Sequence, residues 1–461
     1  MPYTDFIAAI DLGTSQMVGM VGTKNATGAL SVIAYEVENS GTCIRRGCVY
    51  NVKETAVKIK RLILKLENKL GGSKIAQVYV GLGGQSLRSI DHSVCQVLGT
   101  EGVVTEEIVN SLYQKCKEYH PDMVTVYDIV SPSYYLDEKF EPNPVGVPCT
   151  RIEARYKLIV GRPSLKSSII NSFSEFDNIK IAGIMVSPLT LGDVVLSDNE
   201  KDLGCALIDF GAGVTTLTVY KGGRLENLTV IPFGGSLISK DITNLRVVES
   251  EAERLKITYG SAKADRENDM SIEVSLADGM GLREIKLAEL NTVIEARMDE
   301  ILENVYARLE NTGLANSLGA GVVITGGGAA LKDLPTVMKE RLKMDVRYSV
   351  IRKGIVTSGV DLAVTSNPEY AVAVGLLARG VQNCALYIPP KPEPKPEPKF
   401  EPVVDEQIEQ EAKVEEKKKV EAKSTKKKST GLRFPWSKRK GEDLLKTWSK
   451  NLFDDDENES K

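Results

Sequence analysis

Two short segments of this sequence each place an aspartate and a glycine-rich turn directly after an apolar run. Residues 6–10 lead into Asp11-Leu-Gly-Thr-Ser, and residues 205–208 lead into Asp209-Phe-Gly-Ala-Gly. Glycine in a tight turn lets backbone N–H groups approach phosphate oxygens with no Cβ in the way. The aspartates would not touch phosphate themselves, because like charges repel, but a carboxylate at such a place usually holds Mg²⁺, often through water. The two segments therefore predict turns that bracket one metal-bound triphosphate, with Asp11 and Asp209 as its metal residues.

A third apolar run, residues 322–325, ends in Gly326-Gly-Gly-Ala and then enters a predicted helix. Such a turn suits close approach of the backbone to a flat ring or a phosphate. The spacing is not that of the dinucleotide fingerprint, and no Walker lysine follows, so both of those interpretations fail. A single turn of this kind is more often a plain hairpin, but three in this order favour a ligand site. The residues expected to contact the ligand here are Asp11, Gly13, Thr14, Ser15, Gln16, Asp209, Gly211, Gly213, Thr215, Gly326, Gly327, Gly328 and Ala329.

The elements that must position these turns alternate between strands and helices. Each aspartate turn is followed by a second β-rich run, at residues 17–21 and 216–220, so one hairpin plan is used twice. Residues 290–309 repeat apolar side chains at helical spacing, which predicts a long amphipathic helix. The sequence is thus predicted to form an α/β protein with two related lobes that face one ligand.

The composition is that of a chain with a buried core. Of its 461 residues, 42% are hydrophobic and 26% charged, which suits two or three domains. The net charge of −4 argues against a dedicated nucleic-acid binder. The seven cysteines are scattered without a CxxC pair, which favours reduced thiols in a cytosolic compartment. We expect no signal peptide, because no basic region precedes the first apolar strand. We also expect no membrane-spanning helix, because no uncharged apolar stretch of about 18 residues occurs.

The composition changes sharply after residue 388. Six of the ten residues 389–398 are proline, which predicts an extended spacer, and residues 411–430 hold too little apolar area to fold. Residues 389–430 are therefore expected to be a disordered linker. Beyond it, residues 431–461 carry both tryptophans and predict an amphipathic helix with basic flanks, which is typical of a peripheral anchor on an anionic membrane. The residues expected at the membrane are Trp436, Lys438, Arg439, Lys440, Leu444, Leu445, Trp448, Leu452 and Phe453.

One alternative for this tail stays open, namely a helix that docks on a partner protein or packs back on the body. The acidic run at residues 454–457 counts against the anchor, because anionic lipids would repel it.

The order of the three turns resembles the two phosphate loops and the adenosine loop of the superfamily of actin, sugar kinases and heat-shock chaperones. Within it, nearly all of residues 5–385 resemble the family of the bacterial cell-division protein FtsA. The likeness is carried by Asn-Pro-Val-Gly at 143–146, Ile-Pro-Phe-Gly-Gly at 231–235, Glu-Ala-Glu-Arg-Leu-Lys at 251–256 and Ala-Val-Gly-Leu-Leu at 373–377. The resemblance implies ATP and Mg²⁺ as ligands and an actin-like, ribonuclease H-like fold. It adds four residues to those expected to bind the nucleotide, namely Gly234, Gly235, Glu253 and Lys256. Of these, Glu253 and Lys256 would hold the ribose.

The resemblance also implies a division of the chain. The small inserted subdomain would sit on the first lobe and serve self-assembly and recruitment of later division proteins. Another subdomain would grip the C-terminal peptide of FtsZ, the tubulin-like ring protein, where an exposed Arg297 could pair with acidic side chains rather than being merely solvated. The implied parts are the first-lobe core at 4–83 and 161–199, the insertion at 84–160, the second-lobe core at 200–234 and 311–388, the peptide-binding subdomain at 235–310, the linker at 389–430 and the anchor at 431–461.

One departure from the superfamily concerns catalysis. Members that hydrolyse ATP well place Glu, Gln or Asp on the connection into the second lobe, but residues 186–191 hold no acid or amide. We therefore expect ATP to act as a conformational and assembly ligand, with slow hydrolysis at best. A second departure is Ala212, where glycine is common.

The function implied is that of a cell-division adaptor on the cytoplasmic face of the membrane at the septum. It would bind ATP, self-associate into filaments, and bind FtsZ, other division proteins and anionic lipid, with no nucleic-acid partner. An actin-like small-molecule kinase stays an alternative, although no catalytic acid is placed beside an acceptor pocket. A pilus-platform relative is a further alternative, although it does not account for the anchor. A chaperone is disfavoured because no substrate-binding β-domain follows the body.

Overall fold

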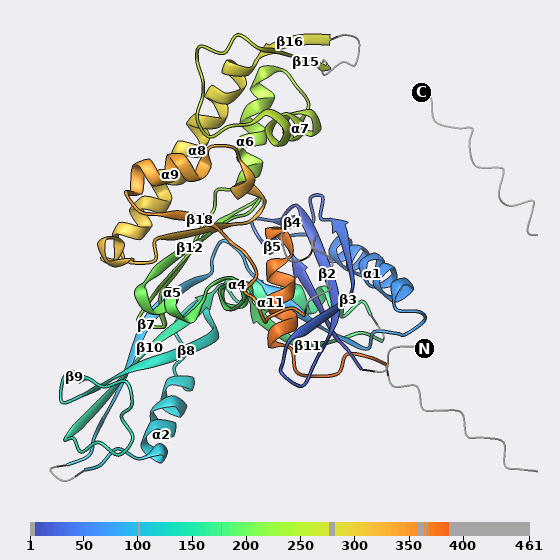
Figure 1. Cartoon of the computed structure of the whole chain (residues 1–461). Coiled ribbons are helices and arrows are strands. Elements are labelled where there is room, and N and C mark those ends of the chain that lie inside the picture. The colour runs from blue at the N-terminus through green and yellow to red at the C-terminus, as the bar shows by residue number, and fades with distance from the viewer. Residues whose placement is uncertain are drawn as a thin grey trace, which may run out of the picture. The chain divides into compact units, whose positions relative to one another are not determined.

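The computed structural model describes residues 5–99, 102–176, 178–275, 282–357, 364 and 367–386, which all fall in one compact unit (Figure 1). The linker and anchor predicted for residues 389–461 lie outside the described residues. None of the described helices has the length and apolar character needed to cross a membrane.

The first sheet is built around the strand that carries Asp11. Its elements and covering helices are β1 (Ile7–Leu12), β2 (Gln16–Lys24), β3 (Leu30–Asn39), β6 (Gln77–Leu82), β11 (Lys180–Val186), α1 (Val52–Lys69), α3 (Ser164–Phe173), α4 (Ser187–Val195) and α11 (Ala371–Arg379). The strand order is β11-β6-β1-β2-β3, with β1 antiparallel to β2 and parallel to β6. Every residue of β1 is buried except Asp11, which is partly buried, as expected for a central strand covered on both faces.

Helix α1 shows how the sequence specifies this lobe. Its N-terminus is capped by the Asn51 side chain, which accepts a hydrogen bond from Glu54 N, and such caps stabilise helices by about 1 kcal/mol. Buried residues follow at helical spacing, including Ile59, Leu62 and Leu66. This apolar stripe lies against β2 and β3, so the amphipathic pattern fixes the side of the helix that faces the sheet.

The second sheet repeats the hairpin of the first. Its strands are β7 (Arg88–Val97), β8 (Thr125–Leu136), β9 (Lys139–Phe140), β10 (Arg151–Gly161), β12 (Cys205–Phe210), β13 (Thr215–Lys221), β14 (Arg224–Ile231), β17 (Val322–Thr325) and β18 (Val346–Tyr348). Strand β12 is antiparallel to β13 and parallel to β17, the same relation that β1 has to β2 and β6. The predicted reuse of one hairpin plan is confirmed.

The second lobe also carries a helical part. It comprises α6 (Gly235–Ile242), α7 (Glu249–Tyr259), β15 (Ser271–Ser275), β16 (Leu282–Lys286) and α8 (Leu287–Glu310). The predicted helix at 290–309 is confirmed, because α8 buries Leu290, Ile294, Met298, Ile301, Leu302, Val305 and Leu309 along one side. These side chains share a core with β12, β13 and β17.

The region predicted as an insertion has a small core of its own. Strands β7, β8 and β10 and helix α2 (Glu106–Lys117) contribute to it, and α2 lies beside these long strands in Figure 1. Strand β7 also joins β14 through one register pair, Thr229 with Arg88, and the Ser89 hydroxyl accepts a hydrogen bond from Leu228 N at 2.9 Å. The insertion therefore continues the sheet of the second lobe, a connection that the sequence did not predict. Its exact boundaries stay a prediction.

The remaining elements are short. They are β4 (Ile44–Arg45), β5 (Cys48–Val49), α5 (Asp198–Leu203), η1 (Thr243–Leu245), η2 (Ala315–Ser317), η3 (Gly327–Ala330), α9 (Leu334–Leu342) and η4 (Pro368–Tyr370).

Candidate functional site

The structure brings together the two aspartates of the predicted turns. Asp11 lies near the end of β1 and Asp209 near the end of β12, and both are partly buried. Burial, and then the charge of Asp209, raise the pKa of Asp11 from 3.8 to about 7. Burial raises the pKa of Asp209 from 3.8 to about 6. Two neighbouring carboxylates that resist ionisation fit a divalent cation, whose charge would favour the ionised form of both.

The first turn (residues 11–16) meets the second turn (residues 209–215) at Thr14. A Cβ on Gly213 would lie 2.6 Å from Thr14 Oγ1, so the second turn passes this close only because residue 213 is glycine. The Thr14 hydroxyl accepts a hydrogen bond from Gly47 N at 2.9 Å, which leaves its proton available to another acceptor. The two lobes thus present their turns to each other.

The backbone of the first turn is fixed by Ser40. Its N–H donates to Ser15 O at 2.9 Å, and its hydroxyl donates to Gly13 O at 2.7 Å. A Cβ on Gly13 would lie 2.5 Å from Gln16 O, so the predicted glycine is required by the shape of the turn itself.

The second turn is joined to the start of α6. Gly235 N donates to Gly211 O at 3.0 Å, and Ser236 N donates to Ala212 O at 2.8 Å. A Cβ on Gly234 would lie 2.5 Å from that same Ala212 oxygen. Gly234, the first glycine of the pair singled out in the sequence, is therefore what allows α6 to begin against the second turn.

One predicted contact in this turn is corrected by the structure. Thr215 is fully buried, and its hydroxyl donates to Phe233 O at 2.9 Å. The hydroxyl therefore ties β13 to the segment before α6 and is not exposed to a phosphate.

Glu253 and Lys256 meet at the same end of α6. Lys256 Nζ donates to Glu253 Oε2 at 2.7 Å, to Ser239 Oγ at 2.8 Å and to Gly235 O at 3.0 Å. The Lys256 side chain is 13% exposed, whereas that of Glu253 is 46% exposed. The lysine thus anchors α7 to α6, and the glutamate presents a free face to solvent.

The third turn (residues 325–330) closes beside Asp209. Gly326 has φ +83°, and a Cβ there would collide with Asp209 Oδ1. A Cβ on Gly328 would lie 2.9 Å from Phe210 O, so this turn needs glycine for close approach to β12. Ala329 is buried in the core of the second lobe, so its side chain packs inward, and the predicted approach of the backbone of this turn to a ligand stays a prediction.

Glu369 connects the first and third turns and was missed in the sequence. Gln16 Nε2 donates to Glu369 Oε2 at 3.1 Å, and Glu369 Oε1 would lie 3.0 Å from a Cβ on Gly327. The carboxylate comes from η4, more than 350 positions after Gln16. The sequence signal that could have indicated Glu369 was the Asn-Pro-Glu run at 367–369, just before the Ala-Val-Gly-Leu-Leu segment at 373–377.

Ser187 and Gly81 complete the surroundings of Asp11 and were also missed. The Ser187 hydroxyl hydrogen bonds to Asp11 and lowers its pKa slightly against the effect of burial. A Cβ on Gly81 would lie 2.5 Å from Ser187 Oγ and 3.0 Å from Asp11 Oδ1. The first acid further along this connection, Asp193, is engaged elsewhere: its carboxylate pairs with Arg379 at 2.6 Å and with Lys201 at 3.2 Å.

Arg297 is not the exposed cation that was expected. Its side chain is 26% exposed, and its guanidinium pairs through two nitrogens with Asp241 of α6 and through Nη1 with Glu300. The arginine therefore ties α8 to α6, and any peptide carboxylate would compete with Asp241. The predicted peptide contact itself stays a prediction.

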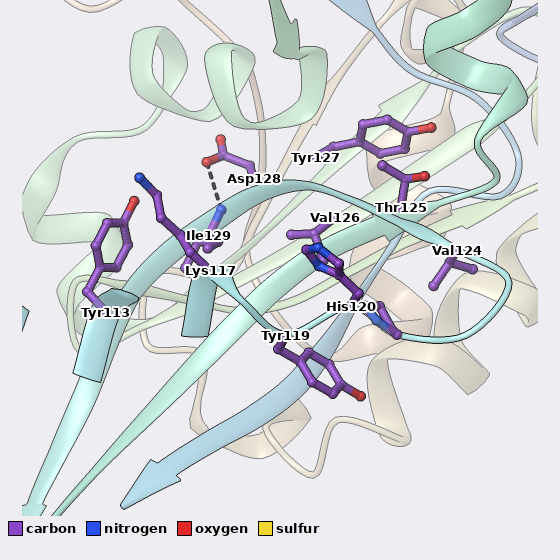
Figure 2. A pocket seen from close by; sticks show the side chains of 11 residues that line it. Tyr113, Lys117, Tyr119, His120, Val124, Thr125, Val126, Tyr127, Asp128 and Ile129 are labelled. Carbon is purple, nitrogen blue, oxygen red and sulfur yellow. Dashed lines mark hydrogen bonds between the residues drawn. The ribbon is translucent and has the colours of Figure 1, made fainter. Parts of the chain in front are cut away.

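A separate cavity of about 600 Å³ lies in the insertion, between α2 and β8. Figure 2 shows the side chains of Tyr113, Tyr119 and His120 around it, with Asp128 accepting a hydrogen bond from Ile129 N. It contains none of the predicted nucleotide residues. We therefore assign the candidate site to the three turns.

The fold and the site define a class of protein. A solved structure titled "PilM-PilN type IV pilus biogenesis complex" matches 82% of this chain and 98% of that chain, with a TM-score of 0.57 and 16% sequence identity, which shows a shared fold alone. With an aspartate–glycine hairpin in each lobe, the chain is an α/β protein of the actin-like two-lobe fold.

The chain belongs to the FtsA family of cell division proteins. The family model described as "Cell division protein FtsA" matches residues 206–375. The cell division protein FtsA of Porphyromonas gingivalis is 36% identical over 383 residues, which cover 83% of this chain and 79% of that protein. The FtsA of Bacillus subtilis is 28% identical over 392 residues, with 84% and 86% covered. The resemblance seen in the sequence is confirmed.

Proposed function

We propose that this chain binds ATP with Mg²⁺ and attaches FtsZ polymers to the cytoplasmic face of the membrane at the division septum. The observation that supports this most is the meeting of three glycine turns, from two lobes, around Asp11 and Asp209. Membership of the FtsA family supports the cell-division role.

Each turn has a distinct part in the proposed nucleotide site. Asp11 and Asp209 would hold Mg²⁺, which supplies neutralising charge for the phosphates when bound. Backbone N–H groups at Gly13 and Gly213 would face the phosphates. The N–H of Gly211 already donates to Val214 O at 3.0 Å, so Gly211 would serve the shape of the turn. The base and ribose would lie between the third turn and the pair of Glu253 and Lys256, where Lys256 already fixes the start of α6.

ATP in this site would be turned over slowly. Residues 186–191 place only Ser187 beside Asp11, and Asp193 is held by Arg379 and Lys201. A serine hydroxyl is a weak general base, so water near the terminal phosphate would lack an activating group. This also argues against a small-molecule kinase, which needs a base at its acceptor.

The further partners follow from family membership and from the tail. We propose that the chain self-associates into filaments and binds the C-terminal peptide of FtsZ through residues 235–310. Later division proteins would bind to the insertion. Residues 431–461 would hold it on anionic lipid.

Equilibrium binding with the full-length protein tests the nucleotide site. Fluorescent ATP analogues should bind in the presence of Mg²⁺, and Asp209→Asn should weaken binding by about 10- to 100-fold, the scale seen when residues around bound metals are lost. Asp122→Asn, a change at an exposed residue of the insertion, should have no effect. Absence of Mg²⁺-dependent binding to the wild-type protein would contradict the proposal.

The partner is tested separately by co-sedimentation with FtsZ and by fluorescence anisotropy with its C-terminal peptide. Saturable binding is expected, and a peptide with its acidic residues neutralised should bind more weakly. A rapid rise in ATP turnover on adding small-molecule acceptors, without peptide binding, would favour the kinase alternative instead.

A further inference from the structure

The short loop between β4 and β5 touches both phosphate-facing turns. Gly47 N donates to Thr14 Oγ1 of the first turn at 2.9 Å. A Cβ on Gly213 of the second turn would lie 3.0 Å from Arg46 Cα. Arg46 therefore sits where the two lobes meet, although nothing in the sequence marked it.

The backbone of this loop is held in an uncommon conformation. Arg46 has φ +49° and Gly47 has φ +72°, and a left-handed conformation is unfavourable for a residue with a side chain. Gln85 N donates to Arg46 O at 3.1 Å, and a Cβ on Gly47 would lie 3.0 Å from Gly84 Cα. The loop is thus fixed by the segment after β6, so the position of Arg46 is set before any ligand arrives.

The guanidinium of Arg46 is weakly engaged. It donates to Gln85 Oε1 at 3.3 Å, and among the described residues it makes no ion pair. The side chain is exposed at the edge of a hollow of about 410 Å³. Its neighbour Arg45 differs, because that guanidinium is stacked over the Tyr50 ring at 3.7 Å. Arg46 therefore keeps donors for an anion, whereas Arg45 is already packed.

We propose that Arg46 donates hydrogen bonds to the terminal phosphate of a bound nucleoside triphosphate. Arginine presents several N–H donors in a planar fork that matches phosphate oxygens. Because Arg46 adjoins both turns, a contact to the third phosphate would also favour the arrangement in which the two turns meet. This inference rests on the proposed nucleotide site and adds to it a residue that distinguishes triphosphate from diphosphate.

The test compares two nucleotides on the full-length protein. Binding of ADP and of the non-hydrolysable triphosphate AMPPNP is measured with Mg²⁺ for the wild type, Arg46→Ala and Arg46→Gln. We expect both variants to bind AMPPNP about 10- to 100-fold more weakly, as for loss of a charge-assisted hydrogen bond, and ADP within about twofold of the wild type. Arg45→Ala is the matched control and should leave both affinities unchanged. Circular dichroism verifies the fold of each variant, and Arg46→Gln keeps an uncharged polar side chain at this position should the alanine variant misfold.

The outcomes separate this inference from the proposed function. If the wild type binds neither nucleotide, the nucleotide site itself fails. If the wild type binds both, but the Arg46 variants bind AMPPNP as well as the wild type, the role of Arg46 is excluded. Equal weakening of ADP and AMPPNP would also exclude it, because the contact would then not depend on the third phosphate.

Discussion

At the scale of single residues, the site is governed by two carboxylates that are costly to ionise together. The pKa of Asp11 is raised to about 7 and that of Asp209 to about 6. Between pH 4 and pH 7 the folded protein keeps protons that the unfolded chain has already lost. The stability of the metal-free protein should therefore fall as pH rises through this window, and the loss is complete above pH 7.

Asp11→Asn should remove much of this dependence. Without Mg²⁺ at pH 8, the variant should be more stable than the wild type by about 1–3 kcal/mol, since a buried charge is replaced by a neutral amide. The difference should shrink toward pH 5, where Asp11 of the wild type is largely protonated. Urea unfolding at the two pH values measures both quantities.

Asp269→Asn provides the control, because the Asp269 side chain is 96% exposed and its ion pair with Lys286 lies at the surface. Its effect should stay below about 0.5 kcal/mol at either pH. A variant Asp11→Asn that is destabilised equally at pH 5 and pH 8 would show that repulsion and burial of charge are not the cause.

The residues that could be read from the sequence are those whose role is local. Asp11, Gly13 and Gly326 follow apolar runs, and their turns need only a few neighbouring positions to form. Ser187 and Glu369 could not be found in this way, because they reach the site from helices α4 and η4, far along the chain from Asp11 and Gln16. Thr215 was misassigned for the opposite reason: its position in the pattern fits, but its hydroxyl donates a hydrogen bond to the backbone carbonyl of Phe233.

At the scale of elements, the contact between α6 and α8 depends on Arg297. Its guanidinium binds the Asp241 carboxylate through two nitrogens, with side chains 26% and 23% exposed. A double-mutant cycle with Arg297→Ala and Asp241→Ala should give a coupling energy of about 1 kcal/mol, because two-point geometry and partial burial strengthen the pair beyond an ordinary surface pair. Urea unfolding of the four proteins measures it.

The pair of Arg254 and Glu251 on α7 is the matched control, since it also has two-point geometry but its arginine is 48% exposed. Its cycle should give only about 0.3–0.5 kcal/mol. Coupling no larger for Arg297 than for this control would mean that Asp241 does not hold the arginine. Among the described residues Glu300 would then be the one acidic partner left to Arg297, and a peptide carboxylate could displace it more easily, as the sequence first suggested.

The elements themselves were largely predictable, but their connections were not. The helix at 290–309 carries an unbroken apolar stripe, and the strands of both hairpins are almost continuously buried apolar runs, so each is specified by its own residues. The joining of β7 to β14 is different, because strand neighbours far apart in the sequence are chosen by shape and packing rather than by a local pattern.

At the scale of the whole molecule, the tail beyond the described residues is the remaining part to test. Deletion of residues 431–461 should abolish flotation of the full-length protein with anionic liposomes, because both tryptophans and most of the basic residues near them are removed. Binding of the intact chain should weaken with salt, since each basic residue near the surface contributes about 1 kcal/mol through a screened interaction.

A shorter deletion serves as the control. Removing only residues 454–461, which are mainly acidic, should preserve or strengthen flotation, because the repelled charges are lost and the apolar residues are kept. Equal flotation of the intact chain and of the chain without residues 431–461 would rule out the anchor. A protein-docking helix would then be the better interpretation of the tail.

The single ladder pair between β14 and β7 has a mechanical consequence. Strands β7 and β10 pair along the whole length of β7. Within the described residues, the backbone pairing of β7 with β14 is limited to Arg88 with Thr229, and the Ser89 hydroxyl adds hydrogen bonds to Leu228. Under load, a sheet yields where the fewest backbone bonds must break. A torque on the inserted strands should therefore rotate them about the β7–β14 junction. The neighbouring β12–β13 hairpin, which carries Asp209, would keep its position.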